Sequence, residues 1–317
     1  MKKVVVFGGG TGLSCLLSGL KLFPIDVTTV IAVSDNGSST GQLRQELDIP
    51  AVGDIGKVIL AMGNVDEDFI QLMGYRFRKE GSLYNHPVRN IIMAALIDLK
   101  GNLTEATKYM CRIMQVKGTV LPLTEETVDL VGESQGQEDN YYGEEEVSMN
   151  VRNIKRLTYD HDITIGREIQ EKIADADLII FSPGSLYTSI LPHLIAPEVR
   201  EALERAKAPL MYVSNLVSQP GETDGLTVSG HIKVLNDYLG KRKIDIVVAN
   251  NGEISEEVRQ HYLTSENKQI VSLDRESVSS MKADIIEDQI FCIEHGAIRH
   301  DALKTAFLIF SYLMTKE

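Results

Sequence analysis

The chain has 317 residues, a formal net charge of −13 and three cysteines that lie far apart in the sequence. The excess of acidic residues argues against broad binding of nucleic acids, since that needs a basic surface to neutralise phosphates. The scattered cysteines exclude a readable disulfide framework or zinc motif, and because no segment has the pattern of a signal peptide or a membrane helix, we expect a cytoplasmic protein without membrane insertion.

Short apolar runs alternate with helical patterns along the chain. Buried parallel strands are typically apolar throughout, and such runs cover residues 4–7, 27–33, 178–181, 210–213 and 244–249. The spacing of apolar residues predicts helices over 13–22, 54–62, 69–77, 87–99, 104–114, 167–173, 198–206, 230–239 and 302–313. This alternation predicts an α/β fold, a Rossmann-like doubly wound and mostly parallel sheet, built as a single domain over residues 1–317.

Residues of about 118–160 interrupt the alternation. Residues 119–122 and 127–131 have the pattern of short antiparallel strands, and a polar middle rich in tyrosine and glutamate follows. A segment of roughly 40 residues is too short to build a core of its own, so we interpret it as a β-rich insertion. The acidic runs 144–146 and 284–288 are interpreted as solvated faces without a function.

A glycine-rich loop separates the first apolar run from the first helical pattern; it consists of Gly8, Gly9, Gly10, Thr11 and Gly12. Glycines let the backbone approach a phosphate, and a helix N-terminus adds about half a positive charge. No Lys-Ser or Lys-Thr follows at Walker A spacing, which argues against an ATPase or GTPase of that kind. The Rossmann fingerprint fits in part, although Cys15 replaces its third small residue. The alternative is a tight turn without a ligand.

Small polar residues also follow the other apolar runs, at residues 34–41, 182–189, 214–223 and 250–252. Ligands of open parallel sheets bind at the carboxyl ends of the strands, so we expect these loops and the glycine-rich loop to face one crevice. Backbone amides and hydroxyls suit phosphate and sugar groups, and they leave few candidates for acid–base catalysis.

Two aspartates lie near the glycine-rich loop. Asp35 and Asp54 are candidate ligands for Mg²⁺ bound with a diphosphate, since Mg²⁺ takes one or two carboxylates plus phosphate oxygens. Asp54 alternatively caps the helix that it begins. His86 and Asn90 flank a helix start at Pro87, where they either reach a ligand or, in the case of His86 or Asn85, cap the helix.

Several motifs in order, residues 8–14, 34–37, 53–54, 183–189 and 214–225, together resemble the YvcK-type gluconeogenesis factors. These belong to the wider 2-phospho-L-lactate transferase (CofD-like) superfamily. The resemblance implies a Rossmann-like fold and a cytoplasmic regulator needed for gluconeogenic growth and for cell shape. It also implies binding of a nucleotide-sugar of the UDP-N-acetylglucosamine kind, with no cofactor required.

The resemblance further implies site residues. Gly10, Thr11 and Gly12 would hold phosphate, together with the flanking Gly8, Gly9 and Leu13 of the same motif. Asp35 and Asn36 would lie at a metal or at the ribose, while Tyr262 would stack on the base and Arg299 would pair with the diphosphate. The crevice would be completed by Gly184, Ser185, Asn215 and Gln219.

The chain departs from the family pattern in two segments. His86-Pro87-Val88-Arg89-Asn90 stands where these proteins usually have His-Ser-Leu-Gly-Asn, and Gly53-Asp54-Ile55-Gly56-Lys57 stands where they usually have Gly-Asp-Ile-Arg-Asn. An arginine is absent from one segment and present in the other. The two changes either compensate each other or mark a different ligand.

Three functions follow from these patterns. The first is a regulator that binds a UDP-sugar without turnover. The second is a CofD-like transferase that moves a phosphorylated group from a nucleotide diphosphate such as GDP, with Mg²⁺ at Asp35 or Asp54. The third is an NAD(P)-binding oxidoreductase, based on the glycine-rich loop and Asp35. A homodimer is the default expectation for the oligomeric state.

Overall fold

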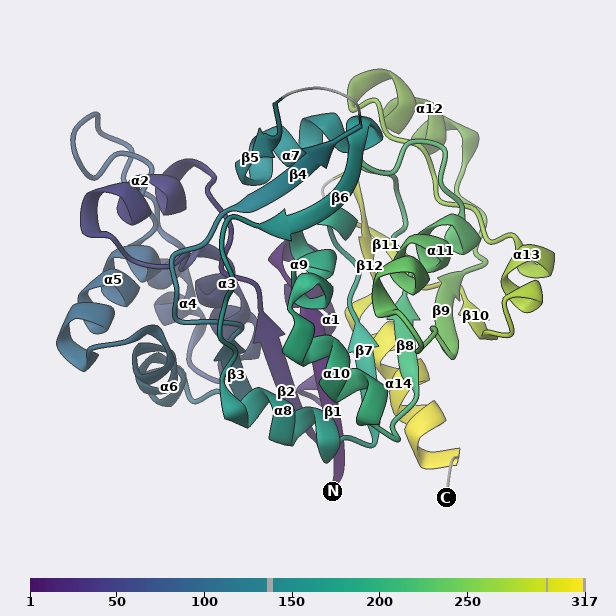
Figure 1. Ribbon diagram of the computed structural model, residues 1–317, viewed down its shortest axis with the longest axis horizontal. Coiled ribbons are helices and arrows are strands. Elements are labelled where there is room, and N and C mark those ends of the chain that lie inside the picture. The colour runs from purple at the N-terminus through teal and green to yellow at the C-terminus, as the bar shows by residue number, and fades with distance from the viewer. Residues whose placement is uncertain (136–138, 295, 316–317) are drawn as a thin grey trace.

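The computed structural model describes residues 1–135, 139–294 and 296–315. Its centre is a seven-stranded sheet in which all neighbouring strands are parallel (Figure 1). In sheet order the strands are β10 (Asp284–Asp288), β9 (Ile246–Asn250), β8 (Leu210–Val213), β7 (Leu178–Phe181), β1 (Lys2–Gly8), β2 (Ile25–Ile31) and β3 (Thr119–Pro122). Outward from β1 the sheet grows in both directions, as in Rossmann-like folds, so the predicted fold class is confirmed.

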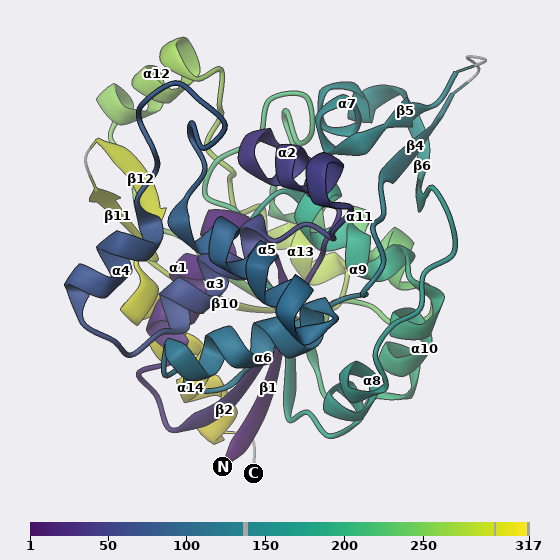
Figure 2. The same ribbon diagram turned by 90° about the vertical axis from the view of Figure 1, so that its left-hand side faces the viewer.

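Helices cover both faces of this sheet, which explains why its central strands are apolar and buried. One face carries α1 (Gly10–Leu20), α3 (Gly53–Met62), α5 (Val88–Lys100), α6 (Leu103–Ile113) and α14 (Ala302–Thr315) (Figure 2). The other face carries α8 (Arg167–Ala174), α9 (Leu191–Ile195), α10 (Pro197–Arg205) and α11 (Val228–Leu239). The remaining helical segments are α2 (Ser38–Leu47), α4 (Glu67–Gly74), α7 (Gly143–Asn150), η1 (Val151–Asn153), η2 (Leu186–Ile190), α12 (Glu256–Ser265) and α13 (Arg275–Ser280).

The neighbouring strands β1 and β7 form the switch point of the sheet. The chain leaves β1 into α1 on one face and leaves β7 through η2 into α9 on the other. Their connections diverge at the carboxyl ends of the strands. This divergence opens a crevice at the place where doubly wound sheets bind ligands.

A small antiparallel sheet stands above the carboxyl ends of the main strands (Figures 1 and 2). It contains β4 (Leu130–Ser134), β5 (Tyr141–Tyr142) and β6 (Ile154–Tyr159), so the β-rich insertion is present. The prediction of an antiparallel strand at residues 119–122 was wrong. That segment is β3, which pairs in parallel with β2 and buries Val120 and Leu121 at the edge of the main sheet.

The C-terminal part adds an edge strand and a hairpin. The acidic residues 284–288, interpreted as a solvated face, form the edge strand β10 and are exposed or half-buried there, although no strand was predicted at this position. Charged residues suit such an edge because they discourage pairing with other chains. The hairpin of β11 (Phe291–Glu294) and β12 (Ala297–His300) then leads into α14.

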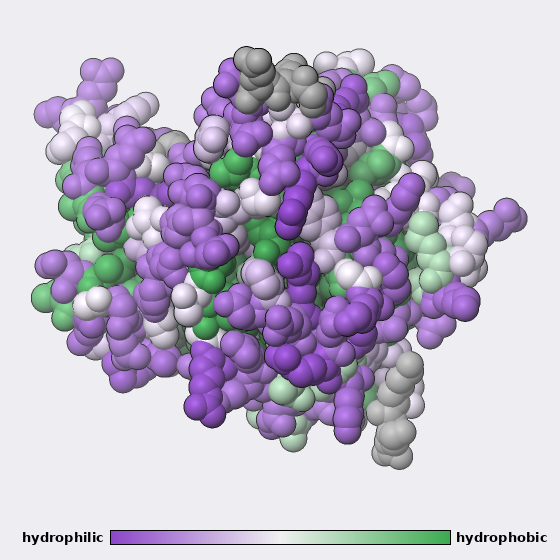
Figure 3. Space-filling model, in the orientation of Figure 1, coloured by the Kyte–Doolittle hydropathy of each residue, from purple (hydrophilic) through white to green (hydrophobic). Residues whose placement is uncertain are grey.

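The visible surface in Figure 3 is mostly hydrophilic, with hydrophobic atoms in small separate patches. Within the described residues, each helix is too short or too polar to cross a membrane.

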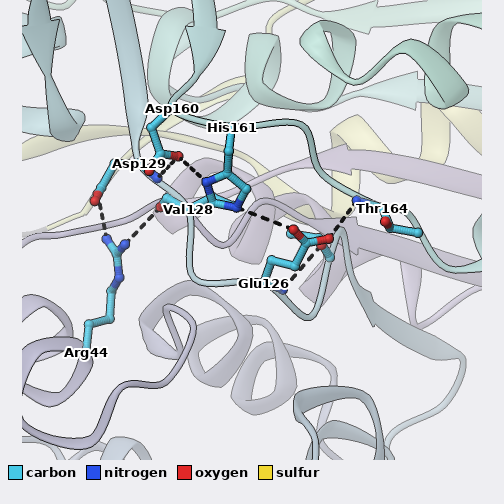
Figure 4. A network of polar contacts seen from close by, with 8 residues as sticks. Arg44, Glu126, Val128, Asp129, Asp160, His161 and Thr164 are labelled. Carbon is cyan, nitrogen blue, oxygen red and sulfur yellow. Dashed lines mark hydrogen bonds and ion pairs between the residues drawn. The ribbon is translucent and has the colours of Figure 1, made fainter.

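A polar network attaches the base of the insertion to α2 (Figure 4). The buried Arg44 donates to Asp129 Oδ1 at 3.0 Å and to the Val128 carbonyl at 2.9 Å. The other end of the insertion joins the network through Asp160, whose Oδ1 accepts the Asp129 N–H at 3.0 Å and lies 3.0 Å from His161 Nδ1. Both ends of the insertion are therefore fixed to the helix that follows β2.

We expect Arg44→Met to lower the melting temperature by a few degrees. The substitution keeps an apolar stem but leaves the Val128 carbonyl without its guanidinium donor, a loss of about 1–3 kcal/mol. Arg205→Met is the matched control, because Arg205 pairs with Glu201 on an exposed helix surface and such pairs contribute about 0.5 kcal/mol. Equal melting temperatures for the two variants would contradict this role of Arg44.

Candidate functional site

A cavity of about 490 Å³ lies at the switch point. Its wall is formed by the loops that follow β1, β2, β7 and β8, together with α7 of the insertion and the end of β12. The expectation that the polar loops converge is therefore met at these four strands. It was wrong for residues 250–252, which line a separate hollow beside α12.

The glycine-rich loop leaves the N-terminus of α1 open. Gly10, the first residue of α1, has φ +67°, a conformation that glycine adopts without strain. Among the described residues no side chain caps α1, and its first turn holds no acidic residue. A Cβ at Gly12 would lie 2.3 Å from the Pro183 carbonyl oxygen, so only glycine lets the two loops approach this closely. Free helix N–H groups facing a cavity suit an anion.

Asn215 holds the opposite wall. Its Oδ1 accepts the Gly184 N–H and its Nδ2 donates to the Gly184 carbonyl, both at 2.8 Å. Gly184 has φ +153°, so this two-point contact fixes a segment that glycine would otherwise leave free. The amide of Asn215 thus shapes the cavity through the backbone that it binds.

Glu222 is a buried carboxylate that joins three segments of the wall. It accepts hydrogen bonds from Ser148 Oγ of α7 at 2.7 Å and from Ser185 Oγ at 2.8 Å. The backbone N–H groups of Leu186 and Tyr187 also donate to it. Burial raises the pKa of Glu222, and these donors oppose that rise. One side chain therefore fixes the insertion against the loop after β7.

Three carboxylates share one side of the cavity. Asp54 Oδ1 accepts a hydrogen bond from Lys57 Nζ at 2.8 Å, and Asp35 lies beside Glu144. Burial, followed by the charge of Asp35, raises the pKa of Glu144 from 4.5 to about 8. The Thr188 hydroxyl opposes the rise. The raised pKa favours the protonated form of Glu144, which donates to Asp35.

The carboxylates in the cavity wall could hold Mg²⁺ only together with further oxygen atoms from a bound molecule. Within the described residues no three His, Cys, Asp or Glu side chains are placed to hold a metal ion by themselves. Asp35 and Asp54 supply two carboxylates, and a bound diphosphate would supply the remaining oxygens.

The cavity also exposes polar groups that are not used within the protein. Arg299 is exposed and forms no ion pair with any residue of the described chain; its Nη1 donates only to the Ile298 carbonyl at 3.4 Å. The Oε1 of Gln219 is buried without a donor. The cation of Arg299 is thus free to contact a ligand, whereas the unpaired Oε1 of Gln219 is not exposed in the cavity.

Most of the predicted ligand residues lie together in the wall; they are Gly9, Gly10, Thr11, Gly12, Asp35, Gly184, Ser185, Asn215, Gln219 and Arg299. Gly8, Leu13 and Asn36 do not line the cavity. Leu13 is fully buried in the core, and Asn36 packs its amide against Gly143.

Tyr262 is not placed to stack on a base. It is 2% exposed, and its hydroxyl oxygen accepts the Ile298 N–H at 2.5 Å. This hydrogen bond braces β12 one residue before Arg299. Tyr262 therefore supports the wall from behind it.

The predicted helix caps were wrong. Asp54 uses its carboxylate on Lys57, and α3 has no side-chain cap. The helix α5 begins at Val88, likewise without a side-chain cap. His86 Nδ1 lies 2.8 Å from Ser39 Oγ, to which Asn90 Nδ2 donates at 3.2 Å, so both residues bind α2 and lie outside the main cavity.

Sequence reasoning missed four charged residues of the wall: Lys57, Glu144, Glu222 and Lys268. Glu144 was included in a run interpreted as a solvated face, and for this residue the interpretation was wrong. A Glu-Glu-Glu run carries no signal that one member points inward. For Lys57 the signal was present, since it lies three residues after Asp54 on one helix.

Comparison with known proteins gives consistent matches over nearly the whole chain. The family model for 2-phospho-L-lactate transferase CofD matches residues 4–291. The gluconeogenesis factor of Bacillus subtilis (strain 168) is 38% identical over 314 residues, 98% of this chain and 98% of that protein. The gluconeogenesis factor of Listeria innocua is 34% identical over 317 residues, 99% of this chain and 96% of that protein.

A solved structure matches equally well. The crystal structure of a UPF0052-family protein from Bacillus halodurans has a TM-score of 0.92 and 35% sequence identity, and the match covers 98% of this chain and 99% of that chain.

We expect Glu144→Gln to become more stabilising relative to the unchanged protein as pH rises from 5 to 8. A carboxyl whose folded pKa is raised from 4.5 to about 8 contributes stability that is full below the unfolded value and is lost as pH rises through the folded value. Glutamine removes this loss, which is on the order of a few kcal/mol. Melting temperatures across the pH range measure it.

The neighbouring Glu145→Gln is the control for this measurement, because Glu145 is exposed. If both variants follow the same pH profile, Glu144 does not carry the buried proton.

Proposed function

The chain belongs to the 2-phospho-L-lactate transferase (CofD) family, and from this premise we propose that it is a cytoplasmic regulatory protein that binds a nucleotide-sugar without turning it over. The ligand class proposed is that of UDP-N-acetylglucosamine. The proposed roles are in gluconeogenic growth and in the maintenance of cell shape, and the first is supported by the name that the relatives carry.

The observation that carries the proposal is the open N-terminus of α1 at the switch point. Its free N–H groups face a cavity of about 490 Å³, a size in the range of small-molecule sites. A diphosphate on this helix end would share the cavity with the unpaired Arg299. The hydroxyl and amide groups of Ser189 and Gln219 suit sugar hydroxyls.

The wall also favours binding over reaction. Apart from Asp35 and Asp54, the free polar groups among its described residues are mainly amides, hydroxyls and the Arg299 guanidinium. The buried carboxylates Glu222 and Glu144 are engaged in holding the wall or in sharing a proton. Groups engaged in this way contribute to a fixed shape, which is what a sensor requires.

A second candidate is a transferase that uses a nucleotide diphosphate and Mg²⁺, because Asp35 and Asp54 both line the cavity beside the glycine-rich loop. Bound Mg²⁺ would supply charge neutralisation at the phosphates. The prediction specific to this candidate is that Asp35→Asn abolishes Mg²⁺-dependent binding of GDP. Binding of GDP that is unchanged in Asp35→Asn would count against it.

We expect UDP-N-acetylglucosamine to raise the melting temperature. A ligand at 100 times its Kd adds about 2.7 kcal/mol, or roughly 4 °C for a chain of this length. UDP, GDP and NAD, each with and without Mg²⁺, complete the panel. The NAD arm tests the oxidoreductase alternative.

Arg299→Ala should abolish most of the shift produced by the UDP-sugar, since it removes the free cation of the wall. Arg259→Ala is the matched control, because Arg259 pairs with Glu256 on α12 outside the cavity. A shift that Arg299→Ala leaves intact, or steady release of product from the UDP-sugar, would overturn the proposal.

A further inference from the structure

A second, smaller hollow adjoins the cavity. It has a volume of about 170 Å³ and shares Asp35 and Lys57 with the main cavity. Its other walls come from the start of α2, the start of α3 and the first turn of α5. The hollow is thus a side chamber of the site at the switch point.

The side chamber contains a buried guanidinium without a partner. Arg89 is 7% exposed, and it forms no hydrogen bond or ion pair with any residue that the structure describes. Burial lowers the pKa of Arg89 to about 10, the nearby charge of Arg76 lowers it further, and the charge of Asp54 opposes this. A buried charge that no carboxylate contacts destabilises the folded protein, so proteins rarely keep one unless something binds it.

The neighbouring helix makes room for this arginine. A Cβ at Gly56 would lie 3.1 Å from Arg89 Cδ and 3.3 Å from Nε, so the stem of Arg89 crosses α3 where that helix has no side chain. Glycine inside a helix is less favourable than alanine. Gly56 therefore provides the space that the Arg89 side chain occupies. Both residues lower the stability of the protein when no ligand is bound.

The charges around the chamber favour an anion. Its lining contains three basic side chains, Lys57, Arg76 and Arg89. Against them stand the Asp35 carboxylate in the lining and the Asp54 carboxylate, which pairs with Lys57 at 2.8 Å. The Oδ1 of Asp35 already accepts the Gly37 N–H at 2.8 Å. This local excess of positive charge contrasts with the net charge of −13 of the whole chain.

Neutral donors complete the chamber. The hydroxyl of Thr40 lies in its wall near the N-terminus of α2, beside Ser39, whose hydroxyl already contacts His86 and Asn90. Among the described residues, no side chain caps α2 and no acidic residue lies in its first turn. The chamber thus combines two guanidinium groups, one ammonium group and a hydroxyl, the donors that bind phosphate oxygens.

We propose that Arg89, Lys57 and Arg76 form a second anion subsite that takes a phosphate-sized oxyanion. The oxyanion is either free phosphate or a second anionic group of the molecule in the main cavity. The subsite is formed within the side chamber, and it does not require that the ligand of the main cavity be a UDP-sugar.

The test is calorimetric titration of the full chain with inorganic phosphate. Arg89→Met keeps an apolar stem and removes the charge, so phosphate should bind the side chamber about ten- to a hundred-fold more weakly. In phosphate-free buffer this variant should melt at the same or a higher temperature, because an uncompensated buried charge is gone. If Arg89 had only a structural role, the Arg89→Met variant would instead melt at a lower temperature than the unchanged protein. Arg112→Met, on an exposed surface, is the control.

A relocated arginine provides the rescue. Arg89→Gly should lose phosphate binding, and the double variant Gly56→Arg/Arg89→Gly should recover it to within a few-fold, since an arginine from α3 enters the space that Arg89 leaves. A folded double variant that binds phosphate no better than Arg89→Gly contradicts the proposed position of the guanidinium.

The source of the anion is resolved by repeating the titration with saturating UDP-N-acetylglucosamine. Loss of the Arg89-dependent phosphate site assigns the anion to the ligand of the main cavity, and persistence of the site assigns it to a separate ion. Phosphate affinity and stoichiometry that are equal in the unchanged protein and in Arg89→Met would overturn the subsite. Failure of the UDP-sugar to bind would not affect the test of the anion subsite, because the titration with phosphate alone does not involve the UDP-sugar.

Discussion

The site depends on one close approach, between the glycine-rich loop after β1 and the loop after β7. At Gly12 and Pro183 the two backbones lie too close for a side chain between them. This contact exists because β1 and β7 are neighbours whose connections leave to opposite faces of the sheet. It brings the open end of α1 to the wall that Asn215 fixes through Gly184. The cavity is therefore a consequence of strand order, and its chemistry is a consequence of which short loops follow the strands.

The insertion belongs to the site as well as to the fold. Arg44 fixes its base to α2, and Glu222 fixes α7 to the loop after β7. Between these two attachments α7 presents Glu144 to Asp35. Because both attachments are buried polar contacts with defined geometry, they hold the insertion in one position over the sheet. A segment too short for its own core thus becomes ordered by the domain it covers.

The sequence indicated the parts of this structure that local pattern determines. Apolar runs marked the central strands, and the glycines marked the turn before α1. The edge strand β10 was missed because its acidic residues suit an exposed edge and mimic a solvated run. The helix α2 was missed because it is short and polar. Glu144 was missed because its burial is set by contacts with Asp35, which is distant in sequence. The changes at Gly56 and Arg89 were visible as two departures, but only the folded chain brings them together.

Two groups around Asp35 are held by burial in environments that oppose their charged forms. Glu144 has its pKa raised to about 8, and Arg89 has its pKa lowered to about 10. Groups of opposite sign relieve such a cost by pairing. Here Glu144 contacts Asp35 and Thr188, while Arg89 forms no ion pair within the described chain and only the charge of Asp54 favours its charged form. The two unfavourable charges, that of Arg89 and that of ionised Glu144, therefore lie on different sides of Asp35. Burial of the unpaired Arg89 charge lowers the free energy of unfolding of the empty protein. A ligand that brings negative charge to Arg89 would remove this penalty, and the free energy regained would add to the affinity for the ligand.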